Sequence, residues 1–401
     1  MESSQHRAAT EVTPMLTTET LEQRIRARVD GLREAQLLRT LRAPSGVDLC
    51  SNDYLQLSNH PLIKERMIDA VRREGCGSTG SRLLRGERES VAAVERSFAA
   101  FKQTERALYF SSGYLANIAA LTTFPEQGDV ILSDERNHAS LIDGLRLSGV
   151  RRVVFPHNDA ATLARLLAQN RGDGQMFVVT ESLFSMDGDT APLVEYARLC
   201  RSAGAVLIVD EAHAVGVYGA RGSGLIEASG TAADVFLSIN TAGKALGVAG
   251  AFVAGPAWAI EYLIQRARPF VFSTAPPPSL AAALEASLAI VAAEPDRRER
   301  LARLSRDLRR QLADAGIPLS AGSSHIIPVM LGENDRAVAV GQALQAQGFD
   351  VRAIRPPTVA AGTARLRISV NIGLGEATIA RFVGVLAVAV RESTRCSAVS
   401  S

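Results

Sequence analysis

Three side chains with catalytic potential follow two apolar stretches in the middle of the chain. Asp210 and His213 end the stretch AVLIVDEAH, and Lys244 follows the stretch VFLSINT. Short apolar runs bounded by glycine and polar residues are typical of strands buried on both faces of a parallel sheet. In such sheets the chemistry lies at the carboxyl ends of the strands. We therefore expect an acid, an imidazole and an amine to meet at neighbouring strand ends.

This combination of groups suits a pyridine aldehyde cofactor. A lysine amine forms a Schiff base with the aldehyde, and an aspartate keeps the pyridine nitrogen protonated so that the ring accepts electrons. Taken singly, each residue also has an ordinary interpretation. An aspartate after a strand is often a helix cap, and a lysine among small residues is usually solvated. It is the combination that favours catalysis.

The composition is that of a globular protein without an electrostatic preference for nucleic acid or an anionic membrane. Of 401 residues, 47% are hydrophobic and 21% charged, and 44 basic against 42 acidic side chains give a formal net charge of +2. The four cysteines lie far apart and include no C-x-x-C pair, which is typical of a reduced, cytoplasmic protein. The sequence contains no Cys/His cluster, so we expect no metal site. The sequence contains no apolar run of about 18 residues, so we expect no membrane span.

Strand and helix patterns alternate around the candidate residues. The apolar stretches ALYF, VILSD, RRVVFP and MFVVTES each precede a helical pattern, which predicts an α/β fold with a mostly parallel sheet covered by helices on both faces. The motif SSGYLAN follows ALYF directly. Small polar residues in the first turn of a helix leave backbone N–H groups free, so this turn favours a phosphate.

Composition and turn signals divide the chain into four parts. We expect a disordered lead-in over 1–17 and an N-terminal segment over 18–51, whose amphipathic helix packs on a larger body. A large cofactor-binding domain over 52–275 follows. Three consecutive prolines then open a smaller C-terminal α+β domain over 276–401.

Eight motifs in order give the chain a resemblance to a known family. They are SNDYL, GSRLLRGE, SSGYLAN, HASLIDG, ESLFSMDGD, VDEAH, TAGKALG and IRPPTVAAGTARLR. With them the chain resembles the α-oxoamine synthases, pyridoxal 5′-phosphate (PLP) enzymes of the aminotransferase-like fold type I, from about Leu21 to Glu392. It departs from the family pattern at Gln56 and Ala214, where glycine is usual. The resemblance implies PLP as cofactor and a homodimer with shared active sites.

For the catalytic centre the resemblance implies four residues. They are Lys244, His138, Asp210 and His213. Lys244 would bind the cofactor as a Schiff base, and its freed amine would act as general base. Asp210 would pair with the ring nitrogen and His138 would stack on the ring, although His138 also suits a plain helix cap. His213 and Ser185 would hydrogen-bond the phenolic oxygen.

The cofactor's phosphate and the substrates have further implied partners. The phosphate would be bound by Ser112, Gly113, Tyr114 and Thr241 and, from the neighbouring subunit, by Ser273 and Thr274. The substrates would be bound by Arg39, Asn52, Arg355, Thr358 and Arg367. Arg367 would hold the amino-acid carboxylate with its planar fork. Two arginines spaced i, i+2 in ARLRISV also fit a solvated strand face.

The reaction that the resemblance implies is a decarboxylative condensation. An amino acid, with L-alanine favoured, would attack an acyl-CoA, with a pimeloyl thioester favoured, and lose carbon dioxide to give an α-amino ketone. The motif IRPPTVAAGTARLR points to biotin biosynthesis. The alternatives are a sibling such as a 2-amino-3-ketobutyrate CoA ligase or a long-chain acyl variant, an aminotransferase, and an accessory subunit that has lost the chemistry.

Overall fold

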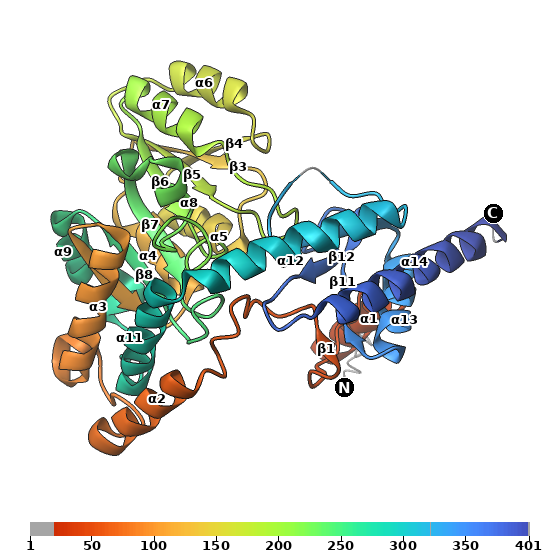
Figure 1. The fold of residues 1–401 in the computed structure, drawn as a ribbon. Helices are drawn as coiled ribbons and strands as arrows, with labels where there is room; N and C mark the ends of the chain where they lie inside the picture. Colours follow the sequence, from red (N-terminus) through yellow and green to blue (C-terminus); the bar gives the residue numbers. More distant parts are fainter. Residues whose placement is uncertain (1–19, 321, 400–401) are drawn as a thin grey trace, which may run out of the picture.

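A seven-stranded sheet forms the centre of the computed structural model, which describes residues 20–320 and 322–399 (Figure 1). The strand order is β2-β8-β7-β6-β5-β3-β4. The bounds are β2 Arg106–Phe110, β3 Val130–Asp134, β4 Arg151–Phe155, β5 Met176–Glu181, β6 Val206–Asp210, β7 Val235–Thr241 and β8 Ala251–Gly255. Every neighbouring pair is parallel except the two that β8 forms. This confirms the predicted α/β fold with a mostly parallel sheet. The lead-in predicted over 1–17 lies outside the described residues.

Helices cover both faces of this sheet, because successive side chains of a strand point to opposite faces. Ile208 of β6 belongs to an apolar cluster with side chains of α4, α5 and α9. Leu207 and Val209 of the same strand belong to a second cluster with side chains of α6 and α7. The bounds of these helices are α4 Gly113–Thr123, α5 Ala139–Ser148, α6 Ala160–Gln169, α7 Leu193–Ala203 and α9 Ala257–Arg266.

The ends of β6 and β7 meet as the sequence predicts. The two strands pair in parallel, and Asp210 lies opposite Ile239. After β7 the chain makes a closed loop before it returns as β8: the Ala242 N–H donates to the Gly250 carbonyl at 2.8 Å, and the Val248 N–H donates to the Ala242 carbonyl at 3.1 Å. The loop thereby holds Lys244 beside the end of β6.

A smaller antiparallel sheet lies in the C-terminal part, in the order β11-β12-β9. Helix α12 runs from the large sheet toward this small sheet (Figure 1). The bounds are β9 Ile326–Gly332, β11 Ala353–Ile354, β12 Ala364–Ser369, α11 Pro278–Ala293, α12 Pro295–Asp314, α13 Asn334–Ala346 and α14 Glu376–Val399. Because α11 packs against helices of the first hundred residues, the division into 52–275 and 276–401 stays a prediction.

Shorter elements complete the fold. They are α2 Pro61–Glu74, α3 Glu89–Lys102, α8 Leu225–Ser229, α10 Arg268–Val271, β1 Val47–Asp48, β10 Phe349–Asp350, a π-helical turn Arg82–Gly86 and a 3₁₀ turn Ala232–Asp234. Strand β1 pairs in parallel with β10, so the N-terminal segment joins the C-terminal part. None of the helices within the described ranges is long and apolar enough to cross a membrane.

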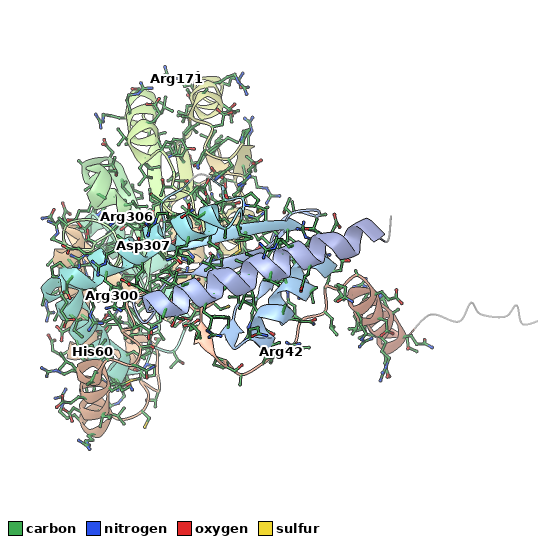
Figure 2. The ribbon with its side chains drawn as sticks, turned by 45° about the vertical axis from the view of Figure 1, so that its right-hand side comes forward. Arg42, His60, Arg171, Arg300, Arg306 and Asp307 are labelled. Carbon is green, nitrogen blue, oxygen red and sulfur yellow. The ribbon has the colours of Figure 1, made fainter. Side chains whose placement is uncertain are left out.

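Helix α1 (Leu21–Glu34) forms within the predicted N-terminal segment. A Thr20 capping box starts the helix, but none of its side chains is buried, and Leu21, Ile25 and Leu32 remain 43 to 65% exposed. Figure 2 shows α1 standing apart from the rest of the ribbon. No side chain of α1 is therefore buried by the rest of the described chain, and the expectation that the helix packs on a larger body stays a prediction. The helical period fixes which face is apolar and leaves open what that face contacts.

Gln56 provides a test of backbone strain. It has φ 52°, a left-handed conformation in which a Cβ atom is unfavourable. The departure from glycine at this position therefore destabilises the turn. We expect Gln56→Gly to raise the free energy of unfolding by about 1 kcal/mol, measured by chemical denaturation. Gln56→Ala is the control, since it keeps the Cβ atom; an equal gain in that variant would contradict the explanation.

Candidate active site

Lys244 and His213 lie together at the ends of β7 and β6. Lys244 Nζ is 2.8 Å from His213 Nε2, and His213 Nδ1 is 2.7 Å from the Tyr54 hydroxyl. Burial lowers the pKa of Lys244 to about 8, against Asp210 and Glu181, which raise it. Burial also lowers the pKa of His213 well below its usual value, and the nearby Lys244 adds to this. The pair thus offers a readily deprotonated amine beside a neutral imidazole.

Asp210 is a buried carboxylate held by neutral donors. Its Oδ2 accepts a hydrogen bond from Asn117 Nδ2 at 2.7 Å, and its Oδ1 accepts one from the Ala212 N–H at 2.8 Å. No lysine or arginine lies within ion-pair distance of it in the part of the chain that the structure describes. A buried carboxylate needs a positive partner, so Asp210 is suited to a cationic ring nitrogen.

His138 caps the start of α5 and is held in one orientation. Its Nδ1 accepts from the Ser140 N–H at 3.2 Å and lies 2.8 Å from Ser140 Oγ, which itself accepts from Asn117 Nδ2 at 2.9 Å. Because Nδ1 accepts a backbone N–H, the proton of the neutral ring lies on Nε2. Burial, with Lys244 acting in the same direction and Asp210 opposing it, lowers the pKa of His138.

The first turn of α4 presents free donors beside Thr241. Ser112 is the N-cap and accepts the Leu115 N–H at 3.3 Å. The Gly113 and Tyr114 N–H groups have no partner within residues 20–320 and 322–399. A Cβ atom at Gly113 would lie 2.3 Å from Thr241 Oγ1, so only glycine permits this approach. Free N–H groups at a helix start favour a phosphate. The Tyr114 hydroxyl donates away from this turn, to Asp143 of α5.

Arg367 of β12 is a buried cation surrounded by neutral acceptors. Its Nε donates to the Ser185 carbonyl at 2.5 Å, one terminal nitrogen donates to Ser369 Oγ at 2.7 Å, and the other donates to Asn52 Oδ1 at 3.0 Å and to the Tyr54 hydroxyl at 3.3 Å. Only 7% of Arg367 is exposed. Tyr54 connects it to His213, so Arg367, His213 and Lys244 form one hydrogen-bonded network.

Arg365, two residues earlier on β12, has a different environment. Its guanidinium forms an ion pair with Asp187 at 2.7 Å. The structure describes no ion pair for Arg367 within its described residues. Both arginines are buried, so the solvated-face interpretation of ARLRISV is wrong. Arg365 has its counter-charge, whereas Arg367 retains an unbalanced charge.

Some predicted site residues lie outside this network. Arg39 donates to Thr358 Oγ1 at 3.0 Å, and Arg355 donates to the Gln36 carbonyl, so these residues form a partly exposed group of their own. Ser273 and Thr274 follow α10 and have no hydrogen bond to the Lys244 network among the described residues.

Glu181 is a site residue that the prediction missed. It ends β5 opposite Asp210, is 3% exposed, and accepts the His138 N–H at 2.6 Å. Burial raises the pKa of Glu181 well above its usual value, and Asp210 raises it further. The rule that pointed to the end of β6 applied equally to the end of β5. Asn117 and Ser140 carried no comparable signal, because helix interiors contain many such residues.

Both the sequence and the fold are similar to those of known proteins. The sequence matches the aminotransferase class I and II family over residues 44–386. An 8-amino-7-oxononanoate synthase of Geobacter sulfurreducens is 45% identical over 371 residues, which are 89% of this chain and 95% of that protein. A serine palmitoyltransferase of S. paucimobilis with a bound PLP–myriocin aldimine has a TM-score of 0.87 at 29% identity and covers 92% of this chain and 97% of its own. An 8-amino-7-oxononanoate synthase of Francisella tularensis has a TM-score of 0.75 at 28% identity and covers 87% and 99%.

The fold, the lysine and the buried acid define a PLP-dependent transferase of fold type I. Within that class, the chain belongs to the family of 8-amino-7-oxononanoate synthases. This confirms the predicted family, the enzyme class and PLP as cofactor. The residues present fit the cofactor. Lys244 supplies an amine with a lowered pKa for the aldehyde, and Asp210 supplies a buried carboxylate without an ion pair for the ring nitrogen. Gly113 and Tyr114 supply free N–H groups for the phosphate.

The lowered pKa of Lys244 gives a pH prediction. Only the neutral amine adds to an aldehyde, so the rate of covalent PLP binding to cofactor-free protein should rise about tenfold per pH unit below pH 8. Above about pH 8 it should level off. The rate can be measured by borohydride trapping and mass spectrometry, with Lys244→Ala as the control. A rise that continues to the pKa of an ordinary lysine would contradict the prediction.

Proposed function

We propose that this enzyme condenses L-alanine with a pimeloyl thioester to form 8-amino-7-oxononanoate for biotin biosynthesis. One new carbon–carbon bond joins the alanine α-carbon to the acyl carbon, and the thiol and carbon dioxide leave. The named relatives at 45 and 47% identity support this assignment. The network that joins Arg367 to Lys244 supports the amino-acid half of the reaction.

The observation that carries the proposal is the unbalanced charge of Arg367. A cation buried without a carboxylate is costly unless a ligand supplies one. Asn52 and Ser185 orient the guanidinium, and Tyr54 connects it to the His213–Lys244 pair. The carboxylate of an amino acid therefore has a preformed partner next to the lysine.

Each polar residue of the site has a proposed task. When bound, PLP supplies a protonated pyridine ring that withdraws electrons from the α-carbon of the substrate. Asp210 holds the proton on the ring nitrogen, and His138 orients the ring. Lys244 removes the α-proton as general base, a role that its pKa of about 8 supports.

We assign the remaining predicted residues on the same basis. Ser112, Gly113, Tyr114 and Thr241 hold the phosphate, and the Ser185 hydroxyl and His213 hold the phenolic oxygen. The group around Arg355 receives the acyl thioester. Ser273 and Thr274 serve the phosphate of the second subunit of a homodimer, and the neighbouring Phe272, which is 73% exposed, supports an interface there. We assign the enzyme to the cytoplasm because the cysteines whose side chains the structure describes, Cys50, Cys76 and Cys200, form no disulfide.

A second candidate is condensation of serine with a long-chain acyl-CoA. The similarity to a serine palmitoyltransferase, with a TM-score of 0.87, favours it. Both reactions use the same lysine, acid and carboxylate partner and differ in the length of the acyl chain and in the amino acid.

Free thiol release distinguishes these reactions. We expect release of CoA from pimeloyl-CoA with L-alanine to exceed release with serine or glycine, and release from palmitoyl-CoA, by about a hundredfold. The measurement is a thiol assay across acyl lengths and amino acids. Preferential turnover of serine with palmitoyl-CoA would establish the second candidate, and a keto acid formed without thiol release would identify an aminotransferase.

Arg367 and Arg365 form a matched pair of substitutions. Arg367→Lys should raise the KM for the amino acid about thirtyfold, which corresponds to about 2 kcal/mol, because a lysine cannot make the two-pronged contact. Arg365→Lys keeps its ion pair with Asp187 and should change that KM less than threefold. Similar KM values for both variants would disprove the proposed carboxylate site.

A further inference from the structure

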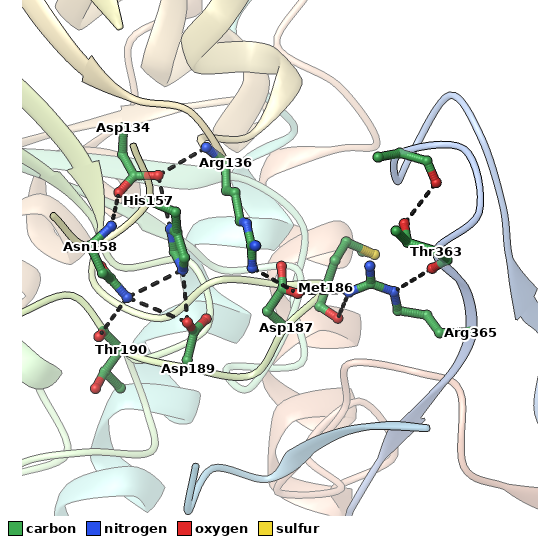
Figure 3. Close-up of polar contacts among 11 residues, drawn as sticks. Asp134, Arg136, His157, Asn158, Met186, Asp187, Asp189, Thr190, Thr363 and Arg365 are labelled. Carbon is green, nitrogen blue, oxygen red and sulfur yellow. Dashed lines mark hydrogen bonds and ion pairs between the residues drawn. The ribbon is translucent and has the colours of Figure 1, made fainter. Parts of the chain in front are cut away.

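A charged cluster outside the catalytic network surrounds His157 (Figure 3). His157 follows β4; its Nδ1 lies 2.9 Å from Asp134 Oδ1 at the end of β3, and its Nε2 lies 2.7 Å from Asp189 Oδ2. The His157 ring also meets the ring of Phe184 edge-on, with centroids 4.4 Å apart. One imidazole therefore connects the ends of β3 and β4 to the segment after β5.

The two carboxylates beside the ring favour its cationic form. Each ring nitrogen faces a carboxylate oxygen, to which a cationic ring donates, and the Asn158 side-chain amide nitrogen also lies 3.2 Å from Nε2. Burial acts to lower the pKa of His157, but the hydrogen bonds to Asp134 and Asp189 raise it to about 9. Asp134 also accepts the N–H groups of Arg136 and Asn158, both at 2.9 Å, which fix its orientation. The His157 contact is therefore a charged link between two oriented groups.

The segment 182–191, which carries Asp189, is closed by its own backbone. The Ala191 N–H donates to the Ser182 carbonyl at 3.1 Å, and the Phe184 N–H donates to the Asp189 carbonyl at 2.9 Å. The Gly188 N–H donates back to the Phe184 carbonyl at 2.9 Å. These hydrogen bonds connect Asp189 to the turn that carries Ser185, so the positions of the two residues are linked.

The opposite side of segment 182–191 contacts the C-terminal part of the chain. The Ser185 carbonyl accepts Arg367 Nε at 2.5 Å, Asp187 pairs with Arg365 at 2.7 Å, and Ser324 Oγ donates to the Gly188 carbonyl at 2.6 Å. Figure 3 shows Arg136 approaching Asp187 from the side of the large sheet and Arg365 from the other. Segment 182–191 thus connects the ends of β3 and β4 to β12.

We propose that His157 is a positioning residue for substrate binding: through Asp189 and segment 182–191 it holds the Ser185 carbonyl where that carbonyl orients the Arg367 guanidinium. The inference rests on the proposed contact between Arg367 and the substrate carboxylate. A two-pronged contact depends on orientation, and a misplacement of about 1 Å reduces catalytic efficiency up to about a hundredfold.

The test separates the amino acid from the thioester. We expect His157→Gln to raise the KM for the amino acid about tenfold, while kcat and the KM for the acyl thioester change less than twofold. Asp189→Ala removes the link at a position whose side chain is 30% exposed, and it should give the same pattern. It takes the place of His157→Gln should that variant not fold. Tyr196→Phe is the control near Asp134, since its buried hydroxyl has no hydrogen-bond partner in the described chain.

Amide hydrogen exchange without substrate gives an independent measurement. The Phe184, Gly188 and Ala191 amides should exchange about tenfold faster in His157→Gln than in the parent protein. Unchanged exchange overturns the inference, and so does faster exchange with an unchanged KM for the amino acid. If the parent protein turns over no amino acid with any thioester, the proposed function fails, and exchange alone then supports or overturns the link through His157.

Discussion

The site depends on one unbalanced buried charge. Arg367 is enclosed by a carbonyl, two hydroxyls and an amide oxygen, and none of these acceptors neutralises it. Its positive potential lowers the pKa values of Lys244 and His213, in addition to the larger effect of burial. The charge that we propose as the partner of the substrate carboxylate thus also favours the unprotonated forms of the neighbouring Lys244 and His213. In the proposed function, binding of the substrate carboxylate and deprotonation of the bases would have a common physical origin.

The histidines of the site show how burial defines their chemistry. The pKa of His325, whose ring packs edge-on against Tyr54 with centroids 4.0 Å apart, is lowered to about 3 by burial and by the charges of Arg367 and Arg309. His138 and His213 are likewise lowered. All three are therefore neutral groups near pH 7. His157, between two carboxylates, is the opposite case, and it belongs to the framework behind the site.

The sequence was sufficient to predict what depends on local pattern. Apolar strands with a polar end gave the sheet and the meeting of Asp210 with Lys244, and ordered motifs gave the family. Contacts between distant segments could not be predicted: Asn52 binds Arg367 across 315 positions, and no period or spacing connects them. What the apolar face of α1 contacts could not be predicted for the same reason, since a helical pattern defines an apolar face without its partner. Glu181 was within reach of the strand-end rule and was overlooked. The proposed roles of Ser273, Thr274 and Arg39 remain predictions.

The return of the chain through β8 limits how this enzyme can be redesigned. Thr241 pairs with Ala251 in the antiparallel ladder, and the Ala242–Gly250 hydrogen bond closes the loop that carries Lys244. Both ends of that loop are fixed to adjacent strands of one sheet. The loop therefore cannot take up an added residue without moving the Lys244 amine. Residues 171–173, in the turn before β5, are exposed and do not belong to the ladder of the sheet. Insertions are therefore better placed in this turn, at the amino end of β5 and opposite the strand ends that carry the reacting groups, than in the loop that carries Lys244.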